Sequence, residues 1–514
     1  MTRTKRSIAN FLSLLVLQAT TIAIGLFSTP LLLQWLGDER FGAFRAATDL
    51  LGYLWLFDLG IGGALCALLV PAIQRSEPRE LGAVIAIGIR AYLKVLAVMT
   101  LGGIGLGLLV SRIVSVEGVI ATELQIGFCV NLLCLLLIPL NVFQLLMDAE
   151  QRGYFKNIAL LIQSVLTSGG LLWFAWLGFG IPGQFFAILL GNFCFSALIT
   201  WKSLQRYPSL IPLILRPPQE HAPSIQQRLW QLNTPGLIFH LAARIGLLSD
   251  NLFISFFLGP AAVVPFLITQ RLAILAQTQL ESVTVATWAA LADLKAQGDD
   301  QTFNARLVDL TRLLMVMGLT IVIPILAYNI HFVALWVGVE RFAGWAVTAL
   351  MAWNITIRGV FHLWKWCFIG TGLANRLVKL SIVDTIVNVG VSLVATQRFG
   401  LVGPLLGTFV SGVGLYSWWM PRLLKQNFGT QPVQLYAVIA RPLFVGIPYS
   451  AIAIWISTHH TPLGWIGLAI EMLITAGLYL VAAWYLVFSL HDRLIWRQRL
   501  LGFLPKRKIK QTIP

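Results

Sequence analysis

The stretch PLLLQWLGDERFGAFRAATDLLGYLWLFDLGIGGAL, residues 30–65, decides how the rest of the chain is interpreted. It is apolar enough to lie in a bilayer, yet Arg45, Asp49 and Asp58 stand between its hydrophobic runs. The tip at residues 37–40 predicts a water-exposed turn, because Gly37 can take the positive φ that ends a helix. The stretch therefore predicts a helix, a tight turn and a second helix that holds charge inside a membrane.

The composition indicates a polytopic membrane protein. The 514 residues are 57% hydrophobic and 11% charged, whereas soluble domains carry about 25% charged residues. The net charge of +16 does not indicate nucleic-acid binding, since no clustered basic face with interleaved aromatic residues is present. A charged side chain at the centre of a bilayer costs roughly 2.5–3.5 kcal/mol on insertion scales, so intramembrane charge is a functional clue.

Apolar runs long enough to cross a bilayer predict an all-α protein with about fourteen transmembrane helices. Most of the 37 Lys and Arg residues lie in alternate connections, and this asymmetry predicts a bacterial inner (plasma) membrane protein with both termini in the cytosol. The predicted spans lie near residues 9-36, 42-71, 81-110, 122-147, 157-178, 182-201, 232-258, 262-290, 308-329, 343-369, 376-396, 401-420, 434-457 and 463-489.

The longest polar connection is rich in proline and divides the chain into similar parts. A weak internal repeat places Leu36-Gly37 and Leu258-Gly259 at the same hinge between paired spans. An even number of spans in each part implies a parallel repeat about an axis along the membrane normal. The predicted organisation is a six-helix lobe at 1-204, a cytosolic linker at 205-230, a second six-helix lobe at 231-421, and an extra helix pair with a basic cytosolic tail at 422-514.

Two motifs carry a family resemblance: PLLLQWLGDERFGAF from Pro30, with its LG-x-x-x-FG turn, and YLWLFDLGIGGAL from Tyr53. They resemble the multidrug/oligosaccharidyl-lipid/polysaccharide exporter superfamily, in particular its polysaccharide (O-antigen and exopolysaccharide) flippase branch. The resemblance covers about residues 8 to 420, and it implies a lipid-linked oligosaccharide as cargo and a role in lipopolysaccharide or polysaccharide biosynthesis. It also implies a polysaccharide polymerase and a ligase as partners in the pathway. The extra helix pair departs from the common twelve-span plan and is similar to the lipid II flippase branch.

Two pairs of basic residues stand four residues apart within predicted spans, so each pair shares a helix face. His240 and Arg244 form the first pair, near the middle of the seventh span. Arg244 is a candidate cavity cation for a phosphate, or a structural arginine paired with an acid such as Asp250. Arg90 and Lys94 form the second pair; they are candidates for substrate binding, although long side chains in this inner half of a span can also snorkel to the cytosolic headgroups.

Arg271 and Gln270 lie side by side in the eighth span and are candidates for contact with a polar substrate. A structural pair between Arg271 and either Glu281 or Asp49 is the alternative. Asp58 falls near the middle of its span and has no obvious partner in the sequence. It is a candidate for ion coupling, or a hydrogen-bonded structural acid.

Arg358, His362 and Lys365 recur at helical spacing on the tenth span and form one basic stripe. Such a stripe would bind an anionic headgroup through Arg358 and Lys365. Trp364 and Trp366 flank it, however, and tryptophans beside basic residues near a helix end are also typical of an interfacial belt.

Enzyme signatures are absent from the sequence. It contains no Walker A motif, no HExxH and no histidines at metal-ligand spacing, so we predict no ATP hydrolysis, no metal, no cofactor and no enzyme activity. The excess of Arg and Lys over acids within the spans fits an anionic headgroup, because guanidinium binds phosphate oxygens with paired hydrogen bonds. For the cargo that the resemblance implies, this headgroup would be the diphosphate of an undecaprenyl diphosphate oligosaccharide in an arginine-lined cavity. Membrane lipids would surround the polyprenyl tail while the two lobes alternate access.

Two other functions compete with this hypothesis. A cation-coupled multidrug exporter of the same superfamily should have acids rather than arginines in its cavity. A membrane glycosyltransferase or ligase acting on the lipid carrier should have a sizeable outer loop to hold its acceptor, whereas every predicted outer loop is short.

Overall fold

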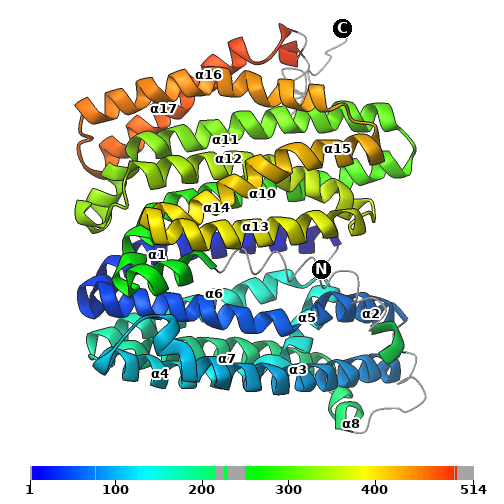
Figure 1. Cartoon of the computed structure of the whole chain (residues 1–514). Coiled ribbons are helices and arrows are strands. Elements are labelled where there is room, and N and C mark those ends of the chain that lie inside the picture. Colours follow the sequence, from blue (N-terminus) through cyan, green and yellow to red (C-terminus); the bar gives the residue numbers. More distant parts are fainter. Residues whose placement is uncertain are drawn as a thin grey trace, which may run out of the picture. The chain divides into compact units, whose positions relative to one another are not determined.

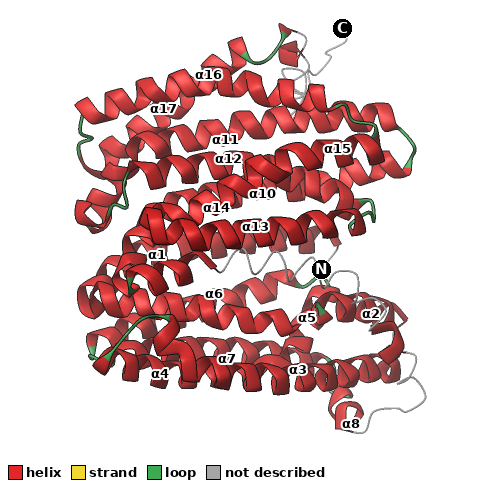
Figure 2. Cartoon of the chain, in the orientation of Figure 1, coloured by secondary structure: helices red, strands yellow, loops and turns green. Residues whose placement is uncertain are grey.

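The computed structural model describes residues 3–58, 60–75, 77–215, 225–229, 249–490 and 492–494. Within these ranges every regular element is a helix and no strand is present (Figure 2). Among the described residues, ten helical stretches are long and apolar enough to cross a membrane, and two of them, Ala9–Trp55 and Asn375–Phe428, each join two predicted spans. The prediction of an all-α polytopic membrane protein is confirmed.

The chain divides into two compact units, one made of residues 1–267 and 377–411 and the other of residues 268–376 and 412–514. The boundaries of these units differ from those of the predicted lobes. The lobes at 1-204 and 231-421, the linker at 205-230 and the extra pair at 422-514 stay a prediction.

In the first unit, long helices pack against one another around small residues. The helices α6 and α7 are in close contact, and α7 also packs on α4 (Figure 1). A Cβ added at Gly191 of α7 would lie 1.9 Å from Oγ1 of Thr167 of α6, so glycine allows the close approach that membrane helices favour. The unit contains α1 (Arg3–Gly52), η1 (Tyr53–Asp58), α2 (Ile61–Arg75), α3 (Pro78–Ile113), α4 (Gly118–Leu132), η2 (Leu133–Leu140), α5 (Asn141–Ala149), α6 (Gly153–Trp176), α7 (Gly180–Arg206), α8 (Leu210–Leu215), a helical segment at 249–258, η3 (Pro260–Ala262), the first residues of α10 (Val263–Ala296), most of α13 (Asn375–Phe399), η5 (Gly400–Val402) and α14 (Gly403–Ser411).

In the second unit, α11 is the central helix, because it packs against α12, α16 and α17 (Figure 1). Its buried residues include Thr311, whose Oγ1 accepts a hydrogen bond of 3.0 Å from Nε1 of Trp364 on α12. The unit contains the rest of α10, α11 (Asp300–Val337), η4 (Val339–Arg341), α12 (Trp345–Gly370), a π-helical segment η6 (Gly412–Tyr416), α15 (Ser417–Phe428), α16 (Pro432–His459) and α17 (Gly464–Leu486).

The turn predicted at Gly37 is present as a break inside α1. Gly37 has φ 76° and ψ 164°, a backbone region that is essentially restricted to glycine. Gly259, just before η3, has nearly the same backbone, with φ 88° and ψ 161°. The two hinges that the weak repeat aligned therefore share one backbone geometry.

Arg40, at the predicted water-exposed tip, makes an ion pair. Its Nε lies 2.9 Å from Oε2 of Glu123 on α4, and its Nη2 donates to Oε1 at the same distance. The Glu123 carboxylate also accepts the backbone N–H of Ile181, at the start of α7, at 3.3 Å. One carboxylate on α4 thus connects the part of α1 just after the Gly37 break to the start of α7.

Candidate functional site

Three predicted site residues lie outside what the structure describes. His240 and Arg244 fall in the gap between residues 229 and 249, and the side chain of Asp58 is not described either. A phosphate-binding role for Arg244 and an ion-coupling role for Asp58 stay predictions.

Arg90 and Lys94 lie on α3 of the first unit, and both side chains are exposed. Their spacing of four residues puts them on one face of this helix. Exposed side chains at these positions could bind a substrate headgroup or snorkel to the headgroups of membrane lipids. A role for this pair in substrate binding therefore also stays a prediction.

Gln270 and Arg271 lie near the start of α10, and both are half-buried. Arg271 and Glu281 are ten residues apart on α10, about 15 Å along the helix axis, and a structural pair between Arg271 and an acid stays a prediction. Glu281 instead accepts a hydrogen bond of 2.8 Å from Nε2 of Gln277. Asp49, in the first unit, accepts one of 2.5 Å from Nδ2 of Asn251.

The second unit brings Glu281 of α10 and His362 of α12 together. The two groups interact electrostatically, and the helices pack closely, since a Cβ added at Gly359 would lie 3.3 Å from Leu280. Nε1 of Trp366 donates to Nε2 of His362 at 2.9 Å, so the proton of the neutral imidazole is on Nδ1. The sequence singled out His362 but gave no signal that Glu281 would face it.

The basic stripe on α12 divides into an exposed and a packed part. Arg358 is exposed, whereas the ammonium group of Lys365 lies over the ring of Tyr416, 4.3 Å from its centroid. Tyr416 ends the π-helical segment η6, and such segments are frequent at functional sites. Trp364 is fully buried, so an interfacial belt is the wrong interpretation for this residue.

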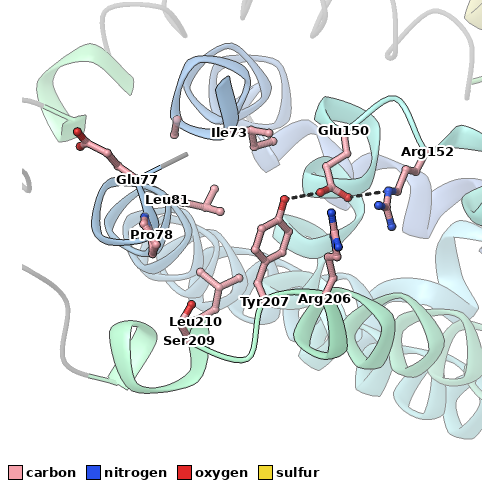
Figure 3. A pocket seen from close by; sticks show the side chains of 11 residues that line it. Ile73, Glu77, Pro78, Leu81, Glu150, Arg152, Arg206, Tyr207, Ser209 and Leu210 are labelled. Carbon is pink, nitrogen blue, oxygen red and sulfur yellow. Dashed lines mark hydrogen bonds and ion pairs between the residues drawn. The ribbon is translucent and has the colours of Figure 1, made fainter. Parts of the chain in front are cut away.

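A pocket of about 390 Å³ lies in the first unit where α2, α5 and α7 end and α3 begins (Figure 3). Tyr207 and Arg152 point toward Glu150: the Tyr207 hydroxyl donates a hydrogen bond to this carboxylate, and Nε of Arg152 lies 3.3 Å from its Oε2 (Figure 3). Burial and the bond to Glu150 raise the pKa of Tyr207 to about 12, so its phenol is neutral at physiological pH. No local pattern in the sequence predicts this cluster, because Glu150 and Arg152 lie between α5 and α6 whereas Tyr207 follows α7.

The described residues at these sites contain no set of side chains that could form a metal centre. Across the described ranges, no group of three or more His, Cys, Asp or Glu side chains could hold a metal ion. The first unit therefore carries candidate cations on α3, and the second unit carries separate candidate cations on α10 and α12 together with the neighbouring Glu281 and His362.

Comparison with known proteins finds matches among solved structures only. No protein-family model and no curated protein matches the chain. An inward-facing multidrug resistance MATE family transporter of the MOP superfamily matches with a TM-score of 0.63 and 17% identity, covering 79% of this chain and 96% of its own. The lipid II flippase MurJ in an inward closed conformation matches with a TM-score of 0.67 and 14% identity, covering 97% of this chain and 100% of its own.

These two structural neighbours are a multidrug transporter and a lipid II flippase. Their likeness to this chain extends over most of its length, and it agrees with the all-helical, multi-pass organisation described above. The chain therefore has the fold of transporters of the multidrug/oligosaccharidyl-lipid/polysaccharide exporter superfamily.

Proposed function

We propose that this protein is a flippase that moves a lipid-linked (undecaprenyl diphosphate) oligosaccharide from the cytosolic to the outer leaflet by alternating access through an arginine-lined cavity. The observation that carries this proposal is the length of chain that each structural neighbour covers. The lipid II flippase covers 97% of the chain and the multidrug transporter 79%. The additional coverage by the flippase is consistent with a counterpart of α16 and α17 in that protein. Its name states that it moves a lipid, lipid II.

The chemistry of such a cargo fits the intramembrane cations. A diphosphate needs cationic donors, and Arg271, Arg358 and Lys365 on α10 and α12 supply them, with Arg90 and Lys94 on α3 as further candidates. Arg244, outside the described residues, is a sixth. The membrane potential supplies about 2.3 kcal/mol per charge per 100 mV for a cycle that moves net charge.

The remaining parts of the proposal follow from the cargo. The protein would lie in the inner membrane with both termini in the cytosol, and polysaccharide polymerase and ligase enzymes would consume the flipped product. A cation-coupled multidrug exporter is the second candidate function, favoured by one observation: an acid, Glu281 of α10, lies near enough to His362 of α12 to interact with it electrostatically.

Flipping of a fluorescent undecaprenyl diphosphate oligosaccharide in proteoliposomes tests the proposal. We expect Arg271→Ala to lower the apparent affinity for this lipid about 10- to 100-fold, because a charge-assisted hydrogen bond contributes about 1.5–3 kcal/mol. Arg306→Ala is the matched control, since Arg306 is an exposed cation near the start of α11 whose nearest acid is Asp309 at 4.0 Å. Absence of transport by the intact protein across several glycans and imposed gradients would favour the exporter.

A further inference from the structure

A second cavity, of about 540 Å³, lies within the helical bundle of the first unit. Its walls come from η1, α2, α3, η2, α5, α6 and α7, and Asn192 contributes to it from the middle of α7. The volume falls within the roughly 300–1,000 Å³ typical of small-molecule sites. None of the described residues that line this amide pocket is charged; its polar and aromatic members include Trp55, Tyr92, Asn141, Gln144, Gln163 and Asn192.

Two irregular helical segments meet at the amide pocket. Trp55 comes from the 3₁₀ segment η1, and Cys134, Leu137 and Ile138 come from the 3₁₀ segment η2. A 3₁₀ stretch in the middle of a helix often marks a functional hinge, and irregular backbone at membrane depth is tolerated where it is buried in protein or lines a cavity. The meeting of η1 and η2 at one pocket favours a binding site over a packing defect.

One wall of the amide pocket is already hydrogen-bonded. Nε2 of Gln163 donates to Oδ1 of Asn192 at 2.6 Å, and Nδ2 of Asn192 donates to Sγ of Cys134 at 3.6 Å. These bonds fix the orientation of both amides, so this wall presents a defined pattern of donors and acceptors.

Other residues that line the amide pocket carry polar side-chain groups that make no hydrogen bond within the described part of the chain. Among the residues described, no hydrogen bond reaches the side chains of Asn141, Gln144, Trp55 or Ser196. Each amide offers two donor hydrogens and one acceptor oxygen, and indole offers one donor. Asn141 and Gln144 are half-buried and line the pocket, so an apolar ligand would cover their amides without a hydrogen bond, at a cost of about 1–3 kcal/mol each. The pocket therefore favours a polar ligand.

The chemistry of the lining residues determines which kind of ligand fits the pocket. A diphosphate or a cation needs a counter-charge, which the lining does not supply. A sugar ring presents neighbouring hydroxyls, each a donor and an acceptor, that match planar amides, and its apolar face packs on an aromatic ring. Trp55, 41% exposed, provides such a ring. We infer that the amide pocket binds an uncharged pyranose unit of the glycan, an inference that rests on the proposed flippase function for the origin of that sugar.

Binding of free sugars tests the pocket without any transport step. Saturation-transfer NMR of the intact protein in lipid nanodiscs would use methyl glycosides of glucose, galactose, mannose, rhamnose and N-acetylglucosamine as probes. We expect at least one to bind, and we expect Gln144→Leu and Asn141→Leu each to weaken its binding about tenfold, the effect of a lost hydrogen bond of about 1.4 kcal/mol. Gln125→Leu is the matched control, because Gln125 is an exposed amide on α4 that bonds Ser111 outside the pocket.

The inference that the amide pocket binds a sugar is overturned if none of the five glycosides binds. It is also overturned if both leucine variants bind the glycosides as tightly as the intact protein does. Transport then separates the pocket from the proposed function. Flipping of undecaprenyl diphosphate with its glycan should lose apparent affinity in Gln144→Leu, while flipping of undecaprenyl diphosphate alone should not. Sugar binding without any flipping would reject the flippase and retain the pocket, whereas flipping that no pocket variant alters would reject the pocket and retain the flippase.

Discussion

At the scale of single residues, the break at Gly37 gives the sharpest stability test. A Cβ at Gly37 would have no atom within 4 Å, so the cost of Gly37→Ala is backbone strain alone, about 1–3 kcal/mol. Thermal unfolding in detergent should show the loss. Gly63→Ala is the control: Gly63 lies in α2 and also has open space around it, so alanine should be neutral or stabilise by up to about 1 kcal/mol. Equal melting temperatures for the two variants would contradict the strain argument.

Gly37 could be predicted from the sequence, because a glycine between two apolar runs is a local signal. Gly42 could not. A Cβ at Gly42 would lie 1.9 Å from the carbonyl oxygen of Pro260, so this glycine lets one hinge approach the other. That contact joins residues far apart in the chain, and it exists only once the helices have packed. Candidate residues show the same division: His362 was visible as part of a helical pattern, but its contact with Glu281 depends on how α10 meets α12.

At the scale of helices, the Arg40–Glu123 pair joins α1 to α4, and a double-mutant cycle measures its contribution. With side chains 38% and 20% exposed, we expect Arg40→Ala and Glu123→Ala to show a coupling of about 0.5–1 kcal/mol. The coupling should weaken in high salt because part of the pair is in contact with solvent. Urea or thermal unfolding of the four proteins in the cycle provides the measurement.

The pair Arg75–Glu80 is the control for that cycle. It has one hydrogen bond, of 2.9 Å, and its arginine is 59% exposed, so its coupling should be smaller. A coupling for Arg40–Glu123 that is no larger than this control would show that the two-bond geometry contributes nothing beyond an ordinary surface contact.

Whole helices were more predictable than their irregular segments. The apolar run at 81-110 corresponds to α3 (Pro78–Ile113), and that at 463-489 to α17 (Gly464–Leu486), because burial in a bilayer requires long apolar runs. Pro139 gave a local signal for η2, since proline removes a helical hydrogen bond. The residues of η1 contain no such signal, and the convergence of η1 and η2 on the amide pocket was not visible in the sequence.

At the scale of the whole molecule, composition and hydropathy were sufficient to predict an all-helical, multi-pass protein. They did not indicate which helices form each compact unit. Residues 377–411 belong with the first unit although they follow much of the second in the chain, and this grouping depends on contacts between helices rather than on the order of apolar runs. The sequence offers intramembrane charges as candidates for substrate binding, but hydropathy cannot indicate which of these charges face one another.

The orientation of the chain in the membrane is the remaining prediction, and labelling of single cysteines with a membrane-impermeant maleimide tests it. Excess Lys and Arg in alternate connections places residues 205 and 297 in the cytosol and residues 117 and 340 outside. All four side chains are exposed. In intact cells we therefore expect Glu117→Cys and Glu340→Cys to react at once, and Gln205→Cys and Gln297→Cys to react only after permeabilisation.

The five native cysteines are free thiols, so the unsubstituted protein provides the background measurement. Labelling of Gln297→Cys in intact cells would show that the orientation is the opposite of the predicted one. The pocket at Tyr207 would then open on the outer side, together with the ends of α2, α5 and α7. Because a flippase takes its cargo from the cytosolic leaflet, the same result would reverse the direction of the transport that we propose.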